Sequence, residues 1–210
     1  MNYTHYLFDL DGTLTDPGVG IKNSIRYALE KFDLPSLEES TLDRFIGPPL
    51  LDSFEKYCGV SAEDSRTLLH LYREYFSDRG IFENTVYDGI DEVLRTLRER
   101  GARIYLATSK PEPYAVRILE HFDLIKHFTF VGGSTMDEKR TDKAEVIAYV
   151  MERANIPTEG AVMVGDRKYD ILGGKVNGLA TVGVLFGYGG RAELADADYI
   201  IAAPTELLTL

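Results

Sequence analysis

Six short apolar segments, which alternate in the later part of the chain with amphipathic helical patterns, constrain the fold more than any other feature. The segments are Tyr6–Asp9, Arg103–Ala107, Phe128–Val131, Ala161–Val164, Ala180–Leu185 and Tyr199–Ile201. Apolar residues between the later segments recur at the spacing of one helical face, as in Ile90/Val93/Leu94/Leu97 and Val146/Ile147/Val150/Met151. Strands that alternate with helices favour a parallel sheet with crossover connections. We therefore expect an α/β fold, a Rossmann-like parallel sheet with helices on both faces.

A helical module interrupts this alternation after the first apolar segment. From about Val19 to Phe82 no convincing strand is found, and apolar residues follow helical spacing in Ile21/Ile25/Ala28/Leu29/Phe32, Leu50/Phe54/Tyr57 and Leu68/Leu69/Tyr72. We expect residues 1–15 and 85–210 to form the α/β core and residues 16–84 to form an inserted all-helical cap. Gly18 and Asn84-Thr85 are the predicted hinges.

The charge of the chain limits its partners. The 210 residues include 34 acidic and 23 basic side chains, which give a formal net charge of −11. A chain this acidic repels nucleic acid and anionic membranes at long range, so we expect it to bind neither. An anionic substrate must then be held by local cations.

The sequence predicts a cytoplasmic protein. Hydrophobic residues make up 44% and charged residues 27%, and no run approaches the roughly 18 apolar residues of a membrane-spanning helix. The segment Met1–His5 lacks the cationic region of a secretory signal. Cys58 is the only cysteine, which excludes an intrachain disulfide and a cysteine-clustered metal site. The sequence leaves open whether the chain is a monomer or a homodimer.

Two aspartates lie where the first apolar segment ends, within Phe8–Thr15. Alternation along a strand places Asp9 and Asp11 on the same side, next to a glycine-containing turn. Like charges this close raise each other's pKa, so the pair requires a divalent cation, a shared proton or both. One carboxylate can attack phosphorus, while the other protonates the leaving oxygen and then activates water. The alternative is a surface Asp-x-Asp turn, which the flanking apolar strand and the Gly-Thr turn argue against.

A pair of hydroxyl side chains follows the second apolar segment. Thr108 and Ser109 come directly after Ala107, and a helix is expected to begin near Glu112. Hydroxyl groups and helix-terminal N–H groups can hold phosphate oxygens. The same residue types are also favoured as helix caps, and taken alone the two interpretations are equally supported.

A lysine occupies the first turn of another expected helix. Asp142 and Glu145 have the spacing of a capping box that opens a helix ending near Ala154, and Lys143 lies between them. A cation in that turn opposes the helix dipole by up to about 1 kcal/mol unless an anion lies beside it. A phosphate and two aspartates would be such anions, although a solvated surface lysine is an equally good interpretation of the residue alone.

Two further aspartates, Asp166 and Asp170, follow the fourth apolar segment. Carboxyl ends of parallel strands meet at one edge of a sheet, so Asp166 is expected near Asp9. Mg²⁺ prefers hard oxygen ligands and needs only one or two carboxylates beside a phosphate. Asp166 can supply the second carboxylate, or it can simply cap the helix that follows.

The segment Asp9–Leu14, Asp-Leu-Asp-Gly-Thr-Leu, resembles the signature of the haloacid dehalogenase superfamily. Nearly the whole chain resembles the phosphoglycolate phosphatase-like group of that superfamily, which has a helical cap inserted after the first strand. The resemblance implies that Asp9 is the nucleophile and Asp11 the general acid/base. It also implies a Mg²⁺ ion bound by Asp9, the backbone carbonyl of Asp11 and Asp166.

The same resemblance implies roles for the other motifs. Thr108 would hold the phosphate, with the adjacent Ser109 and with Gly12 as further phosphate-binding residues, and Asp170 would orient the metal site. Lys143 would be the essential lysine of the family.

The lysine assignment has competitors. Many family members follow the essential lysine with proline, whereas Ala144 follows Lys143 in this chain. Lys139 and Lys110 are therefore alternative phosphate-binding lysines.

Two loops resemble loops of the same family. In Phe45–Leu50 the turn at Gly47 and Pro48 is expected to contact substrate or to connect two helices. The glycine-rich Gly187–Gly190 is expected to be structural rather than a nucleotide cradle.

Together these clusters predict a Mg²⁺-dependent phosphatase that acts on a small phosphorylated metabolite through an aspartyl-phosphate. Phosphoglycolate, a nucleoside monophosphate and a sugar phosphate are all compatible with the sequence. The alternatives are a phosphomutase of the β-phosphoglucomutase type, a pyrophosphatase and, from another class, a non-catalytic binding module.

Overall fold

The computed structural model describes residues 3–210, so Met1 and Asn2, which belong to the segment used above to argue against a secretory signal, lie outside the described residues. Short 3-10 or π turns are labelled η. The elements in chain order are β1 (His5–Phe8), β2 (Thr15–Asp16), α1 (Gly18–Lys31), α2 (Glu39–Leu42), η1 (Asp43–Phe45), α3 (Leu50–Cys58), α4 (Ala62–Tyr75), η2 (Phe76–Gly80), β3 (Thr85–Val86), α5 (Ile90–Glu99), β4 (Arg103–Pro111), α6 (Glu112–His121), η3 (Ile125–His127), β5 (Phe130–Ser134), α7 (Lys143–Ala154), β6 (Ala161–Gly165), α8 (Lys168–Val176), β7 (Ala180–Val184), β8 (Tyr199–Ile201) and η4 (Pro204–Thr209).

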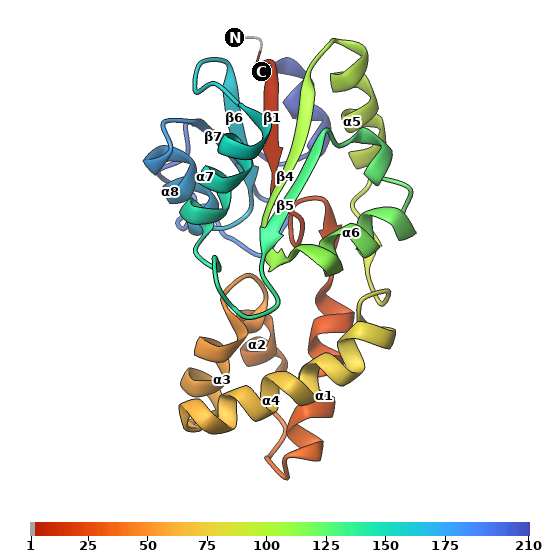
Figure 1. Cartoon of the computed structure of the whole chain (residues 1–210), viewed down its shortest axis with the longest axis vertical. Helices are drawn as coiled ribbons and strands as arrows, with labels where there is room; N and C mark the ends of the chain where they lie inside the picture. Colours follow the sequence, from red (N-terminus) through yellow and green to blue (C-terminus); the bar gives the residue numbers. More distant parts are fainter. Residues whose placement is uncertain (1–2) are drawn as a thin grey trace. The chain divides into compact units, whose positions relative to one another are not determined.

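A six-stranded parallel sheet with the order β5-β4-β1-β6-β7-β8 organises the larger part of the chain. Helices α7 and α8 cover one face of this sheet, and α5 and α6 lie on the other (Figure 1). Each of the six apolar segments overlaps one of its strands. The predicted α/β fold with a Rossmann-like parallel sheet is therefore confirmed.

The strand register brings three chain segments together at one edge of the sheet. Phe8, the last residue of β1, pairs with Leu106 of β4 on one side and with Val164 of β6 on the other. The next residue, Asp9, donates its backbone N–H to the Val164 carbonyl at 2.9 Å. Because all three strands are parallel, the residues that follow them emerge side by side.

The packing of α7 against the sheet decides which side chains reach this edge. Leu7 of β1 is fully buried in the same cluster as Ile147 and Val150 of α7. Alternation along the strand turns Asp9 toward the same face as Leu7. Lys143 lies one helical turn before Ile147 and so shares its face of α7. The hydrophobic contact between β1 and α7 therefore aligns Asp9 with Lys143.

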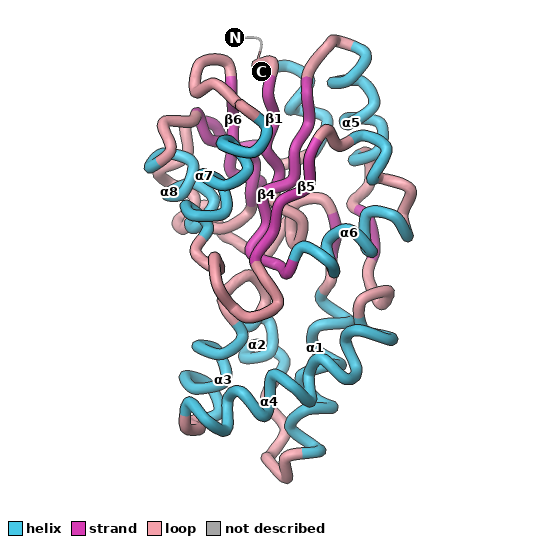
Figure 2. Tube along the Cα trace, in the orientation of Figure 1, coloured by secondary structure: helices cyan, strands magenta, loops and turns pink. Residues whose placement is uncertain are grey.

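The chain divides into two compact units. One contains Val86–Leu210 and the chain up to Thr15, and the other is Asp16–Thr85. The second unit is all-helical, and the three predicted helical patterns correspond to α1, α3 and α4 (Figure 2). The two-residue strands β2 and β3, which pair where the chain leaves and re-enters the larger unit, were not predicted because no periodicity is visible in two residues.

Gly20 and Gly80 explain how the ends of the helical unit pack so closely. A Cβ atom on Gly20 would overlap the Gly80 carbonyl oxygen, and one on Gly80 would lie 2.5 Å from the hydroxyl of Ser24. Gly20 also donates its N–H to the Glu83 carbonyl at 2.9 Å. Small residues at this crossing let α1 meet η2 backbone to backbone.

Across residues 3–210, every helix is too short or too polar to cross a membrane.

We predict that Ile147→Ala lowers the free energy of unfolding by about 2–5 kcal/mol, because it leaves a cavity between α7 and the sheet. Ile147 is completely buried, whereas Val176 at the end of α8 is 77% exposed. The matched change Val176→Ala should therefore alter stability by no more than about 0.5 kcal/mol. Urea unfolding of both variants checks this, and equal losses would contradict the assigned core.

Candidate active site

A buried ion pair links Asp9 to Lys143. The Lys143 Nζ lies 2.7 Å from Asp9 Oδ1, and only 6% of the Lys143 side chain and 10% of the Asp9 side chain are exposed. Asp142 caps α7 by accepting from the N–H groups of Ala144 and Glu145, which fixes Lys143 as the first helical residue. The local fold thus places the Lys143 ammonium group next to the carboxylate of Asp9, the residue that follows β1.

Asp170 and a backbone carbonyl provide the other contacts of Lys143. Its Nζ lies 2.9 Å from Asp170 Oδ1 and donates to the Ala107 carbonyl at 3.2 Å. Burial alone would lower the pKa of Lys143, but the carboxylates of Asp170 and Asp9 more than offset it and raise that pKa. Lys143 is therefore a permanent cation at the end of the sheet.

Asp170 is oriented from both sides of its carboxyl group. Its Oδ2 accepts the backbone N–H of Arg167 at 3.0 Å, while Oδ1 faces Lys143. Burial raises the pKa of Asp170 to about 6, against the lowering effect of Lys143, and the charge of Asp9 raises it further. Gly165 makes room for this carboxylate, because a Cβ atom there would overlap it.

Asp11 forms a separate ion pair with Lys110. The Lys110 ammonium donates to Asp11 Oδ2, and both side chains are largely buried. Asp11 Oδ1 is also buried and has no hydrogen-bond partner within residues 3–210. Burial raises the pKa of Asp11, Lys110 opposes that shift, and Asp9 adds to it. The two neighbouring aspartates are thus held by two different lysines.

Asp166 is completely buried; one of its carboxylate oxygens accepts a hydrogen bond, and the other is bare, which means that no described residue donates to it. Its Oδ2 accepts the backbone N–H of Tyr188 at 2.8 Å, and its Oδ1 accepts no hydrogen bond from any described residue. Burial raises the pKa of Asp166 well above its ordinary value, and the charges of Asp170 and Asp9 raise it further. Gly12, with φ +85°, packs against this carboxylate where any Cβ atom would overlap it.

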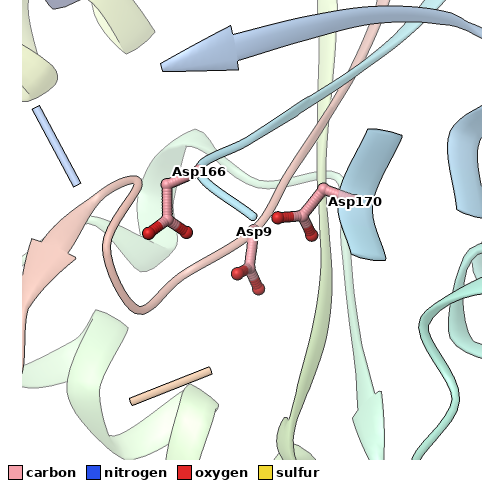
Figure 3. A group of neighbouring side chains, drawn as sticks. All are labelled: Asp9, Asp166 and Asp170. Carbon is pink, nitrogen blue, oxygen red and sulfur yellow. The ribbon is translucent and has the colours of Figure 1, made fainter. Parts of the chain in front are cut away.

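Three of these carboxylates fit a divalent cation. One oxygen from each of Asp9, Asp166 and Asp170 lies within 4.8 Å of the others, and Figure 3 shows Asp9 between the other two. The unpartnered Asp166 Oδ1 is the kind of buried acceptor that a cation satisfies. Hard carboxylate oxygens are the ligands that Mg²⁺ prefers. The carboxylate of Asp11 does not belong to this group, so Asp11 could contribute only its backbone carbonyl.

The charges of the cluster also favour a divalent cation. The site contains four carboxylates, those of Asp9, Asp11, Asp166 and Asp170, and two ammonium groups. Lys110 pairs with Asp11, and Lys143 pairs with Asp9 and Asp170, which leaves two negative charges when all six groups are ionised. Buried charges without a partner are costly, so the cluster requires protons or a cation of charge two.

The segment that contains Thr108 and Ser109 differs in one respect from the prediction. Strand β4 does not end at Ala107 but continues to Pro111, with a shift in its pairing to β5 between Thr108 and Pro111. Gly133 of β5 permits this, because a Cβ atom there would lie 2.5 Å from the Lys110 carbonyl oxygen. Thr108 is buried and accepts the Lys110 N–H at 3.3 Å, while Ser109 is half-buried beside it. Helix α6 begins at Glu112 as predicted.

Other predicted residues lie outside this cluster. The Lys139 side chain is 81% exposed and pairs with Asp137. Gly47, with φ +104°, is exposed, and Pro48 is half-buried, in the helical unit between η1 and α3. Of the three lysines considered, Lys143 and Lys110 both reach buried aspartates.

Two features of the site could not be found from the sequence. The pairing of Lys110 with Asp11 depends on the extension of β4, and no local signal marks it. The contact of the Tyr188 N–H with Asp166 joins residues on either side of β7. The glycines around Tyr188 were the available signal, and they were interpreted only as a structural loop.

We predict that Lys143→Met lowers the free energy of unfolding of the metal-free protein by about 3–5 kcal/mol, because it leaves two buried carboxylates without their cation. Lys139→Met removes an equivalent charge from the surface and should change stability by about 0.5 kcal/mol at most. Chemical denaturation at neutral pH measures both. If the two variants were equally stable, Lys143 would not be the cation that holds the cluster.

Comparison with known proteins assigns the family. Residues 6–184 match the model of the haloacid dehalogenase-like hydrolases. A 5'-nucleotidase of Pseudomonas aeruginosa is 41% identical over 194 residues, which cover 92% of this chain and 88% of that protein. The tyrosine-protein kinase PtkA of Mycobacterium tuberculosis is 40% identical over 90% of this chain, which spans only 64% of the length of that kinase.

The crystal structure of a predicted phosphatase from Clostridium acetobutylicum superimposes over the full length of both chains with a TM-score of 0.94 and 42% sequence identity. The matched residues include the strands and helices that carry Asp9, Lys143 and Asp166. The chain therefore belongs to the haloacid dehalogenase-like hydrolase family.

Proposed function

We propose that this chain is a Mg²⁺-dependent phosphatase that hydrolyses phosphomonoesters of small metabolites by in-line attack of Asp9 on phosphorus. The observation that carries the proposal is the buried position of Asp9 between a lysine and a bare carboxylate oxygen. A nucleophile there is shielded from water and lies beside the Lys143 ammonium, whose positive charge stabilises a transferring phosphoryl group.

The proposed metal site consists of Asp9, Asp166 and the backbone carbonyl of Asp11. Asp170, the third carboxylate of the group, is assigned instead to orienting Lys143, because its two oxygens already face the Lys143 ammonium and the Arg167 N–H. A bound Mg²⁺ would supply positive charge for the phosphoryl oxygens. Family membership and the donor set, which consists of oxygen atoms only, support this ion rather than a softer metal.

The protein's own residues then divide the remaining tasks. We assign the hydroxyl of Thr108 and the ammonium of Lys143 to the phosphate oxygens, with Ser109 and Gly12 as further proposed contacts of the phosphate. Asp11 delivers a proton from its unpartnered Oδ1 to the leaving oxygen. The same oxygen later takes a proton from the water that hydrolyses the aspartyl-phosphate.

Among small substrates, a nucleoside 5'-monophosphate is the first class to test. The relative at 41% identity is named a 5'-nucleotidase, whereas a phosphoglycolate phosphatase 1 of the same organism is 29% identical. We propose that the helical unit selects the substrate and that Gly47 and Pro48 are the first positions to vary in it. The net charge of −11 favours a free metabolite in the cytoplasm over a substrate on nucleic acid or membrane.

Two alternative reactions differ from hydrolysis in the acceptor of the phosphoryl group. The 40% identical relative is named a tyrosine-protein kinase, and a phosphomutase would likewise return the group to a hydroxyl other than water. Both reactions would use the same Asp9 nucleophile. Phosphate release measured beside product mass spectrometry separates them, since transfer to another acceptor leaves free phosphate unchanged. A pyrophosphatase would be identified by its response to pyrophosphate in the same panel.

We predict that wild-type protein with Mg²⁺ releases phosphate from at least one member of a panel of nucleoside monophosphates, sugar phosphates and phosphoglycolate. Asp9→Asn should reduce that release at least about 10³-fold, because it removes the nucleophile while scarcely changing volume. Circular dichroism should confirm that the variant is folded. Turnover close to wild type in a folded Asp9→Asn variant would refute the mechanism.

We also predict that Lys110 acts by orienting Asp11. A leaving oxygen of high pKa needs a proton from Asp11, whereas 4-nitrophenolate leaves without one. In Lys110→Met, kcat/KM for a nucleoside 5'-monophosphate should therefore fall about tenfold more than kcat/KM for 4-nitrophenyl phosphate. Lys110→Arg, which keeps the charge, should recover part of the difference, and Lys139→Met should show none. Equal losses for both substrates would mean that Lys110 does not act through Asp11.

A further inference from the structure

The segment that follows β7 contacts Asp166 and the two residues after it at three points, none of which belongs to the aspartate and lysine motifs. The first contact is the hydrogen bond from the Tyr188 N–H to Asp166 Oδ2, at 2.8 Å. It fixes the carboxylate by one oxygen and leaves the other, Oδ1, buried and without a hydrogen-bond partner in the described chain. The direction of the bare oxygen is thus set by a backbone group 22 residues away.

The second contact is made by two glycines on either side of Tyr188. A Cβ atom on Gly189 would overlap the Asp166 carbonyl oxygen, and one on Gly187 would overlap the Gly12 carbonyl oxygen and crowd the Asp166 side chain. Gly190 comes next in the chain, yet a Cβ atom on it would meet nothing within 4 Å. Glycine is required at Gly187 and Gly189 by close approach to the site, and Gly190 carries no such requirement.

The third contact is made by Glu193. Its Oε1 accepts from the Arg167 Nε at 2.9 Å and from the Lys168 N–H at 3.1 Å. These two residues follow Asp166 and lead into α8, and the Arg167 N–H in turn donates to Asp170. Glu193 therefore holds the backbone that connects the two aspartates.

We propose that Gly187, Tyr188, Gly189 and Glu193 form a clamp that sets the affinity of the protein for Mg²⁺. The clamp hydrogen-bonds the Asp166 Oδ2, packs against the Asp166 carbonyl and binds the two residues that follow, so that Oδ1 would not have to be ordered before it binds an ion. This inference rests on the proposed metal site. Groups that orient a metal ligand typically change metal affinity 10–100-fold when they are removed.

The test compares Gly189→Ala with Gly190→Ala in the full chain, with Mg²⁺ binding measured by isothermal titration calorimetry in the absence of substrate. Gly189→Ala should bind Mg²⁺ at least about tenfold more weakly than wild type, whereas Gly190→Ala should stay within about twofold. The melting temperature with and without Mg²⁺ gives a second readout. A clamp variant loses part of the Mg²⁺-induced rise, because that rise depends on the dissociation constant.

Glu193 provides a test that does not introduce a clash. Glu193→Ala removes the acceptor for Arg167 and Lys168 and should weaken Mg²⁺ binding several-fold, while Glu193→Gln keeps an oxygen acceptor and should bind more tightly than Glu193→Ala. A folded Gly189→Ala with wild-type affinity would overturn the proposal, and so would unchanged affinity in Glu193→Ala if Gly189→Ala does not fold. A wild-type protein that binds no Mg²⁺ would instead overturn the metal site itself.

Discussion

The rest of the site depends on the contacts that the Lys143 ammonium group makes. It contacts carboxylates from the end of β1 and from α8, Asp9 and Asp170, and the carbonyl of Ala107 in β4. Four aspartates are gathered at one edge of the sheet, and their mutual repulsion would open that edge if no cation stood among them. Lys143 can stand there because Ile147 and Val150, further along the same helix face, pack on the sheet. Hydrophobic packing of α7 thus places the positive charge that stabilises the buried carboxylate of Asp9.

Much of the fold and part of the site could be predicted from the sequence. The six apolar segments became the six strands of the sheet, because strand periodicity and length are local properties. Lys143 was marked by its position at the start of a helix, where a cation is unfavourable without an anion nearby. The Lys110–Asp11 pair could not be predicted, because it depends on how far β4 continues, which Gly133 decides from a neighbouring strand. Gly189 could not be predicted either, because glycine is needed there by close contact with the carbonyl of Asp166, which is far away in the sequence.

The site separates two decisions that an enzyme of this kind must make. In the proposed mechanism, the aspartates and lysines of the α/β unit take a phosphoryl group from its donor. The identity of the donor and of the acceptor must be decided elsewhere, which is consistent with relatives of similar identity bearing names as different as 5'-nucleotidase and tyrosine-protein kinase. We propose that the helical unit, Asp16–Thr85, determines the identity of the donor and of the acceptor.

Covalent capture of the phosphorylated residue tests the central claim most directly. Acyl phosphates are reduced by borohydride, which converts a phosphorylated aspartate to homoserine. If Asp9 is the nucleophile, quenching the protein during turnover with borohydride should yield a peptide with homoserine at position 9 and an unchanged Asp11, in a substrate-dependent and Mg²⁺-dependent manner. Phosphate release with no reduction at Asp9, or reduction at another aspartate, would contradict it.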